Sequence, residues 1–144
     1  MTYCLNLNCS QPENPDDVRF CLRCGCRVWL GDRIRPIKPI SKEGIGRTFL
    51  AVDEANANKR LCVIKQLTLK GDDNKERLQE EVWRLQRLGE HRQIPALIAY
   101  FEAGENSMDA IAQEYIDGKS LTEIAATESQ YDETQIRHLL NEML

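Results

Sequence analysis

Four cysteines near the start of the chain constrain the fold more than any other feature of the sequence. Cys4 and Cys9 form one pair, Cys21 and Cys24 form a second, and eleven residues separate the two pairs. This spacing lets the chain fold back and present four thiolates to one tetrahedral Zn²⁺ ion. We therefore predict a small four-cysteine zinc ribbon over residues 1–30, with Zn²⁺ in a structural role.

Several alternatives remain open at this site. Gly25 follows the second pair and suits a left-handed turn that aims backbone N–H groups at a metal-bound sulfur. Cys26 is a fifth candidate ligand and can replace Cys24. Disulfides and a rubredoxin-like iron site are the other ways to use such cysteines. The sequence has no signal-peptide core and no apolar run near the roughly 20 residues of a transmembrane helix. We therefore expect a cytoplasmic protein with metal-bound thiolates and no membrane segment.

The charge of the prefix, residues 1–30, argues against nucleic-acid binding. The whole sequence has a net charge of −4, and the prefix contains three arginines against three acidic residues. Four thiolates around one Zn²⁺ add about −2 to that neutral sum. No basic stripe is present to neutralise phosphates. The sequence therefore favours a structural or protein-binding ribbon and no nucleic-acid partner.

The region after Leu30 predicts an α+β fold with an antiparallel sheet. Alternating or β-branched apolar residues predict five strands, at residues 34–40, 48–52, 61–67, 96–101 and 110–116. The first contains Pro36 and Pro39, which confine it to a sheet edge. Helical patterns cover Asp73 to about Gly89, the segment after Ser120, and the segment from Asp132.

One charged residue disturbs the first helix. Leu78, Val82, Leu85 and Leu88 form an apolar stripe, and Glu81 falls inside it on the helical wheel. A carboxylate in a buried stripe is costly unless a cation or hydrogen bond meets it. The sequence therefore predicts a cationic or hydrogen-bonding partner for Glu81.

Three short motifs occur in order along this region. Residues 62–65 read Cys-Val-Ile-Lys, residues 78–81 read Leu-Gln-Glu-Glu, and residues 113–116 read Gln-Glu-Tyr-Ile. They resemble the Val-Ala-Ile-Lys strand, the αC helix and the hinge of the N-terminal lobe of Ser/Thr protein kinases. With the four-cysteine prefix and the segment 46–53, Gly-Arg-Thr-Phe-Leu-Ala-Val-Asp, the chain resembles the cyanobacterial-type Ser/Thr kinases that carry an N-terminal zinc ribbon.

The resemblance implies site roles and cofactors. In the family the strand lysine, here Lys65, holds the α- and β-phosphates of ATP, and the αC glutamate, here Glu81, holds the lysine. Backbone groups of the hinge bond adenine, which implies Glu114 and Ile116, with Gln113 as gatekeeper. The nucleotide-binding set also includes Gly46, Thr48 and Val63. The resemblance thus implies ATP with Mg²⁺, and a protein substrate or a regulatory protein partner.

The chain also departs from the family pattern. The phosphate loop of the family reads Gly-x-Gly-x-x-Gly, whereas the aligned positions here are Ser41, Glu43 and Gly46. Glu43 places negative charge where the triphosphate would bind, which opposes binding. The sequence contains no His-Arg-Asp catalytic loop and no Asp-Phe-Gly magnesium motif, so no catalytic residue is assigned in it.

Two hypotheses follow for the 144 residues. In the first, residues 1–30 are a zinc-ribbon prefix and residues 31–144 are part of a kinase domain, namely the N-lobe, the hinge and the first C-lobe helices. The last predicted helix has no capping glycine, which favours a fragment that is inactive by itself. In the second, the chain is a stand-alone zinc-ribbon and pseudokinase-lobe module that binds proteins, as the lost loop glycines suggest.

Overall fold

The computed structural model describes residues 1–41, 46–55, 57–67, 72–102, 109–127 and 131–143. The prefix contains two short strands, β1 (Thr2–Tyr3) and β2 (Glu13–Asn14). Five longer strands follow: β3 (Ile34–Ser41), β4 (Gly46–Asp53), β5 (Arg60–Leu67), β6 (Leu97–Phe101) and β7 (Ala110–Glu114). The helices are α1 (Asp72–Leu88), α2 (Leu121–Thr127) and α3 (Glu133–Met143). An antiparallel sheet with helices, preceded by a cysteine cluster, confirms the predicted α+β class.

The five long strands form one antiparallel sheet in the order β3-β4-β5-β7-β6. The proline-containing strand β3 lies at one edge, as predicted, because a proline cannot donate to a second neighbouring strand. Its pairing with β4 shifts register between Pro36 and Lys38 and again between Pro39 and Ser41. Strand β5 is central, with β4 on one side and β7 on the other.

Strand alternation gives the sheet two different faces. Phe49 and Ile64 are cross-strand neighbours on one face, which we call the prefix face. Lys65 lies on the opposite face, the lysine face, where its cross-strand neighbours are Thr48 in β4 and Ile111 in β7. The lysine face thus presents a charged side chain beside the buried Ile111, whereas the prefix face carries the apolar pair of Phe49 and Ile64.

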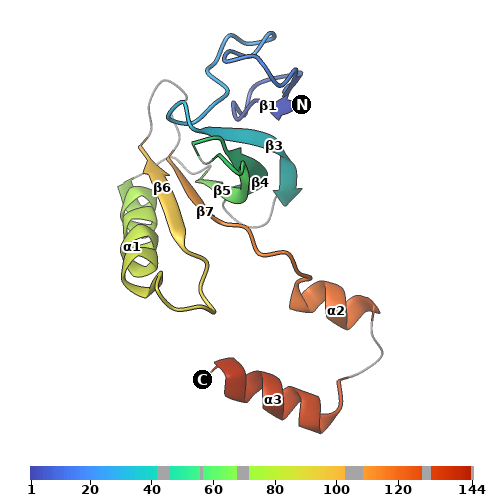
Figure 1. Ribbon diagram of the computed structural model, residues 1–144. Helices are drawn as coiled ribbons and strands as arrows, with labels where there is room; N and C mark the ends of the chain where they lie inside the picture. The colour runs from blue at the N-terminus through green and yellow to red at the C-terminus, as the bar shows by residue number, and fades with distance from the viewer. Residues whose placement is uncertain (42–45, 56, 68–71, 103–108, 128–130, 144) are drawn as a thin grey trace.

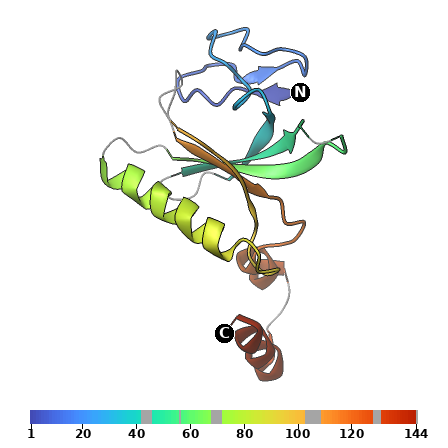
Figure 2. The ribbon, with the colours of Figure 1, turned by 60° about the vertical axis from the view of Figure 1, so that its left-hand side comes forward.

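The prefix packs on the prefix face of the sheet (Figures 1 and 2). Leu5 is only 2% exposed and belongs to one buried cluster with Phe49, Ile64 and other side chains of the sheet. Tyr3 packs against the same cluster, with its ring 5.7 Å from the ring of Phe49. The prefix therefore supplies a layer of the hydrophobic core in addition to its own cysteine site.

Two buried hydrogen bonds join the prefix to different strands of the sheet. Thr2 Oγ1 donates to the carbonyl of Pro36 in β3 at 2.8 Å. The side-chain amide of Gln66 in β5 donates to the carbonyl of Leu5 at 3.0 Å. Both Thr2 and Gln66 are buried. Because an unpaired buried polar group is costly, each bond fixes the position of the prefix on the sheet.

A group of ion pairs stabilises the same junction at the end of β4. Arg33 donates from Nε and Nη2 to the carboxylate of the buried Asp53, at 2.8 and 2.6 Å. Arg35 donates to Glu54 at 2.7 Å and to Asp16 of the prefix at 2.8 Å. The guanidinium of Arg35 therefore bridges the prefix and the residue that follows β4.

Helix α1 runs beside the edge strand β6 (Figure 1). The predicted apolar stripe is only partly covered: Val82 and Leu85 are half-buried, and Leu88 is 49% exposed. The stripe stays partly open because the helix packs along one edge of the sheet. The carboxylate of Glu81 consequently meets more solvent than the helical wheel suggested.

Helices α2 and α3 lie beyond the end of β7, on the side away from the prefix in both views (Figures 1 and 2). The side-chain amide of Gln93 donates to the carbonyl of Glu142 in α3 at 3.2 Å. Among the helices that the structure describes, none has the length and apolar character needed to cross a bilayer.

Candidate metal centre and nucleotide-binding face

The four cysteines come from two loops of the prefix that face each other. Cys4 directly follows β1, and its backbone N–H donates to the carbonyl of Pro12 at 2.7 Å. In the second loop, Gly25 has a φ of 73°, the left-handed conformation that glycine adopts without strain. Its N–H donates to the carbonyl of Cys21 at 2.9 Å, which closes the turn between Cys21 and Cys24.

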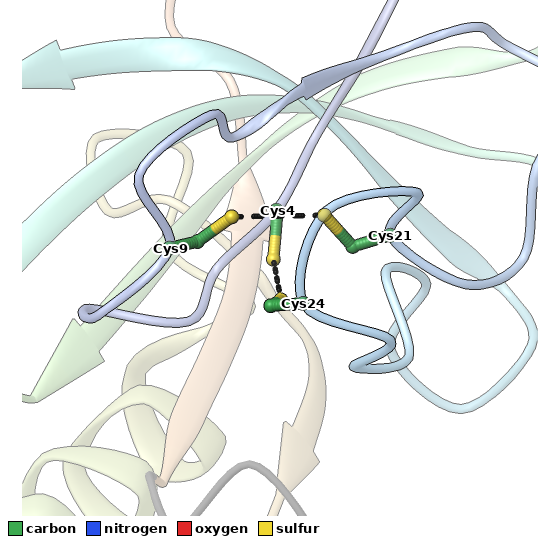
Figure 3. Close-up of side chains that lie close together, drawn as sticks. All are labelled: Cys4, Cys9, Cys21 and Cys24. Atoms are coloured by element: carbon green, nitrogen blue, oxygen red, sulfur yellow. Dashed lines mark hydrogen bonds between the residues drawn. The ribbon is translucent and has the colours of Figure 1, made fainter.

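The sulfur atoms of these cysteines have the spacing of a tetrahedral metal site (Figure 3). The Sγ atoms of Cys4 and Cys24 are 3.6 Å apart, as are those of Cys9 and Cys21, and all four lie within 4.8 Å of one another. Metal–sulfur bonds of about 2.3 Å in a tetrahedron place the sulfurs about 3.8 Å apart. The four cysteines can therefore hold a metal ion with little movement.

Hydrogen bonds prepare part of this cluster for the thiolate form. The backbone N–H of Cys26 donates to the thiol of Cys24 and lowers its pKa to about 6, whereas burial raises the pKa of the Cys4 thiol. The side-chain amide of Asn14 lies 3.5 Å from Sγ of Cys21 and donates to it. Because the thiolate is the metal-binding form, such donors support a metal–thiolate centre.

Cys26, the alternative ligand, lies outside the group of four. Among the described residues, the metal-competent cluster consists of Cys4, Cys9, Cys21 and Cys24. The Sγ of Cys26 accepts a hydrogen bond from the side-chain amide of Asn6 at 3.2 Å instead. Asn6 and Asn14 are contributors that the sequence reasoning missed, and only their positions within the cysteine loops could have indicated them.

On the lysine face, the sheet and α1 bring the predicted ion pair together. The Nζ atom of Lys65 in β5 lies 3.2 Å from Oε1 of Glu81 in α1. The two side chains are 42% and 47% exposed, so the pair borders solvent. Exposed pairs of this kind contribute about 0–1 kcal/mol to stability. The arrangement is therefore more important as a way to aim the lysine than as a stabilising contact.

Two other predicted site residues surround this lysine. Thr48 pairs directly with Lys65 across β4 and β5, and Val63 lies two residues before Lys65 on the same face. Val63 pairs with Gln113, which is buried, on the other neighbouring strand. The half-buried side chains of Thr48 and Val63 thus flank the lysine on a continuous patch of the sheet.

The remaining predicted residues lie at the ends of strands. Gly46 begins β4. Residues 42–45 of the phosphate loop, which include Glu43, lie outside the described residues. Glu114 ends β7, where its backbone N–H donates to the carbonyl of Ala96 at 2.9 Å and its carboxylate pairs with Arg60. Ile116 lies two residues beyond β7 and is exposed.

The chain is similar to several cyanobacterial protein kinases. Serine/threonine-protein kinase B of Synechocystis sp. is 34% identical over 150 residues, covering 100% of this chain and 26% of the relative. Serine/threonine-protein kinase F of the same organism is 32% identical over 142 residues, covering 88% and 29%. Serine/threonine-protein kinase PknA of Nostoc sp. is 34% identical over 122 residues, covering 80% and 21%.

No protein-family model matches the chain. The chain spans about a quarter of the length of the relatives described above, at 26%, 29% and 21% of each.

Proposed function

Because this chain is homologous along its length to cyanobacterial Ser/Thr protein kinases, we propose that it forms the nucleotide-binding part of such a kinase. Residues 31–144 are then the N-lobe, the hinge and the first C-lobe helices, and residues 1–30 are a zinc-ribbon prefix. The complete kinase transfers a phosphoryl group from ATP to Ser or Thr of a protein substrate in the cytoplasm. The observation that carries the proposal is the Lys65–Glu81 pair at 3.2 Å.

Each residue of the lysine face has a role in this proposal. Lys65 holds the α- and β-phosphates, and Glu81 keeps its ammonium aimed at them. Thr48 and Val63 pack against the base and ribose, and Gly46 allows the backbone to approach the phosphates. At the hinge, backbone groups of two residues hydrogen-bond adenine: Glu114 and Ile116. The N–H of Glu114 is already bonded to Ala96, so its contribution is not that donor.

In this proposal the chain binds the nucleotide but lacks the residues that catalyse phosphoryl transfer. Phosphoryl transfer in protein kinases needs a catalytic-loop aspartate to accept the hydroxyl proton, and a second aspartate and an asparagine to hold Mg²⁺. The sequence contains neither a His-Arg-Asp nor an Asp-Phe-Gly motif. The 144 residues should therefore bind nucleotide and not phosphorylate a protein by themselves.

The proposed metal of the prefix is structural Zn²⁺ with four cysteine ligands. It would offset part of the negative charge of the four thiolates and hold the two cysteine loops together, as closed four-ligand zinc sites do. The purified chain should contain about one equivalent of zinc by metal analysis. Cys24→Ser should lose it, whereas Cys26→Ser should retain it, and equal retention in both variants would contradict the ligand set.

Nucleotide binding can be measured by thermal unfolding. ATP at about 100 times its Kd should stabilise the chain by about 2.7 kcal/mol and raise its melting temperature. Lys65→Met should abolish the rise, because it removes the phosphate ligand. Lys119→Met is the matched control, since Lys119 is exposed in the segment before α2 and should keep the full response. A parent chain without any response would refute nucleotide binding.

That negative result would favour the second candidate, a pseudokinase-lobe module that binds a regulatory protein. The observation in its favour is the loss of two loop glycines, at Ser41 and Glu43. A lobe of this kind keeps its fold and zinc site but gives no nucleotide response. The thermal measurement therefore separates the two functions.

A further inference from the structure

We propose that the metal centre positions Lys65 through Leu5 and Gln66, so that metal binding in the prefix raises the nucleotide affinity of the lobe. Gln66 is the positioning residue in this connection. The inference rests on the proposed zinc and nucleotide sites, and it adds a physical link between them.

The first step runs along the chain from the metal ligand. Cys4 is fully buried, and its Sγ lies 3.6 Å from that of Cys24 in the cluster. Leu5 is the next residue, and its side chain is buried in the core of the sheet. Loss of the metal removes the constraint that holds the Cys4 sulfur next to its partners. The peptide that joins Cys4 to Leu5 then transmits any displacement directly to the carbonyl of Leu5.

The second step crosses from the prefix to the sheet. The carbonyl of Leu5 accepts the hydrogen bond from Nε2 of Gln66 at 3.0 Å. Gln66 is 2% exposed, so this bond lies in the interior where it is strong and where its loss is costly. The side chain of Ile64, on the same face of β5, packs in one cluster with Leu5. A displacement of Leu5 therefore acts on two residues of β5 that face the prefix, Ile64 and Gln66.

The third step passes through the strand to the lysine. Lys65 lies between Ile64 and Gln66 on β5, and its side chain leaves from the opposite face toward Glu81. A movement of the backbone at Gln66 changes the direction of Lys65, whose half-exposed pair with Glu81 is too weak to resist it. The connection therefore runs from metal ligand to phosphate ligand through the Gln66–Leu5 hydrogen bond, beside the apolar packing of Leu5 with Ile64.

The molecule contains a matched comparison for this contact. Thr2 also donates a buried hydrogen bond from the prefix junction, at 2.8 Å, but its acceptor is Pro36 in the edge strand β3. Strand β3 is separated from β5 by β4. Loss of the Thr2 bond should therefore loosen the prefix without redirecting Lys65.

The test compares Gln66→Met and Thr2→Val in the zinc-loaded chain, by amide hydrogen exchange and by calorimetric titration with ATP. One internal hydrogen bond corresponds to about a fivefold change in an equilibrium constant. Gln66→Met should speed exchange of the β5 amides and weaken ATP binding by about that factor. Thr2→Val should speed exchange in β3 and leave β5 exchange and ATP affinity unchanged.

Zinc removal from the parent chain with a chelator gives an independent measurement, which also serves if Gln66→Met does not fold. Removal should accelerate β5 exchange in the parent, and it should accelerate it less in Gln66→Met, where the hydrogen bond to Leu5 is already absent. Three results would overturn the inference: equal effects of both variants on β5 exchange, unchanged β5 exchange when zinc is removed from the parent, or the same acceleration by zinc removal in Gln66→Met as in the parent. A parent that shows the exchange pattern but binds no ATP would support the link and refute the proposed nucleotide site.

Discussion

Replacing Leu5 by alanine asks whether the prefix and the sheet unfold as one unit. Leu5 lies next to a proposed zinc ligand, yet its side chain is buried among residues of β4, β5 and β7. If the prefix were an independent ribbon, truncation of this side chain would weaken the ribbon alone. Because the core is shared, we expect the truncation to destabilise the whole described structure.

The magnitude follows from the burial of the side chain. Leu5 is 2% exposed, so the alanine variant loses nearly all the packing of a leucine side chain. Buried leucine-to-alanine changes cost 2–5 kcal/mol, and we take about 3 kcal/mol here. For a chain of this size, 1 kcal/mol shifts the melting temperature by about 4 °C. The variant should therefore melt about 12 °C below the parent.

The assay follows the sheet and the metal in the same sample. Circular dichroism reports loss of the sheet, and a chromophoric chelator reports release of zinc. Both signals should change together and at the lowered temperature in Leu5→Ala. Leu7→Ala is the matched control, because Leu7 is the same residue type in the same prefix but is 47% exposed, so its change should stay within about 0.5 kcal/mol. Zinc release well before loss of the sheet, or equal effects of the two variants, would refute the shared core.

Three further predictions test other parts of the fold. The hydrogen bond from Arg35 lowers the pKa of Glu54, so this carboxylate stabilises the fold above its unfolded pKa of about 4.3, and that stability is lost as the pH falls through the lowered folded value. The free energy of unfolding, measured in urea, should therefore fall less between pH 6 and about pH 3 in Glu54→Gln than in the parent. Gly31→Ala should lower stability by more than about 1 kcal/mol, because φ is 56° and the added Cβ would lie 2.7 Å from an aromatic ring of β6, whereas Gly118→Ala should be neutral in the same urea measurement. Asp53→Asn should cost about 2 kcal/mol by urea unfolding, since it removes a buried charge that accepts two guanidinium hydrogen bonds.

Each of these predictions has a result that would contradict it. If the free energy of unfolding falls with pH equally in Glu54→Gln and in the parent, the contact between Arg35 and Glu54 does not hold in solution. Similar stabilities for Gly31→Ala and Gly118→Ala would argue against the left-handed turn at residue 31. A neutral Asp53→Asn would show that the ion pair makes no net contribution to the junction.

The sequence predicted the strands well, because their signals are local. Alternation and β-branching located all five long strands, and Pro36 and Pro39 indicated the edge position of β3. The register was not predictable in the same way, since it depends on pairings between strands that are far apart in the chain. The two shifts in register along β3 follow from its prolines, but their positions appear only in the folded sheet.

The candidate sites were predictable to different degrees for a related reason. Cysteine spacing grouped Cys4 with Cys24. A charge misplaced on a helical wheel indicated that Glu81 needs a partner, and the resemblance to the kinases indicated Lys65 as that partner. The role of Gln66 was not predictable, because glutamine side chains are mostly exposed and a buried one gives no signal in the sequence. Its importance comes from the Leu5 carbonyl opposite it, which only the packing of the prefix on the sheet places there.

The contact between Leu5 and β5 also has a consequence for the order of events during synthesis. All four cysteines of the cluster precede residue 25, so they can capture an ion soon after they leave the ribosome. Gln66 emerges 61 residues after Leu5, and β7 emerges later still. The apolar side of the nascent prefix is thus exposed while the ribosome translates the strands that cover it, a delay in which non-local folds are prone to aggregate. Early metal capture would keep the prefix in its final shape until these strands are made. Metal supply during synthesis should therefore affect the yield of folded chain more than it affects the stability of the chain once folded.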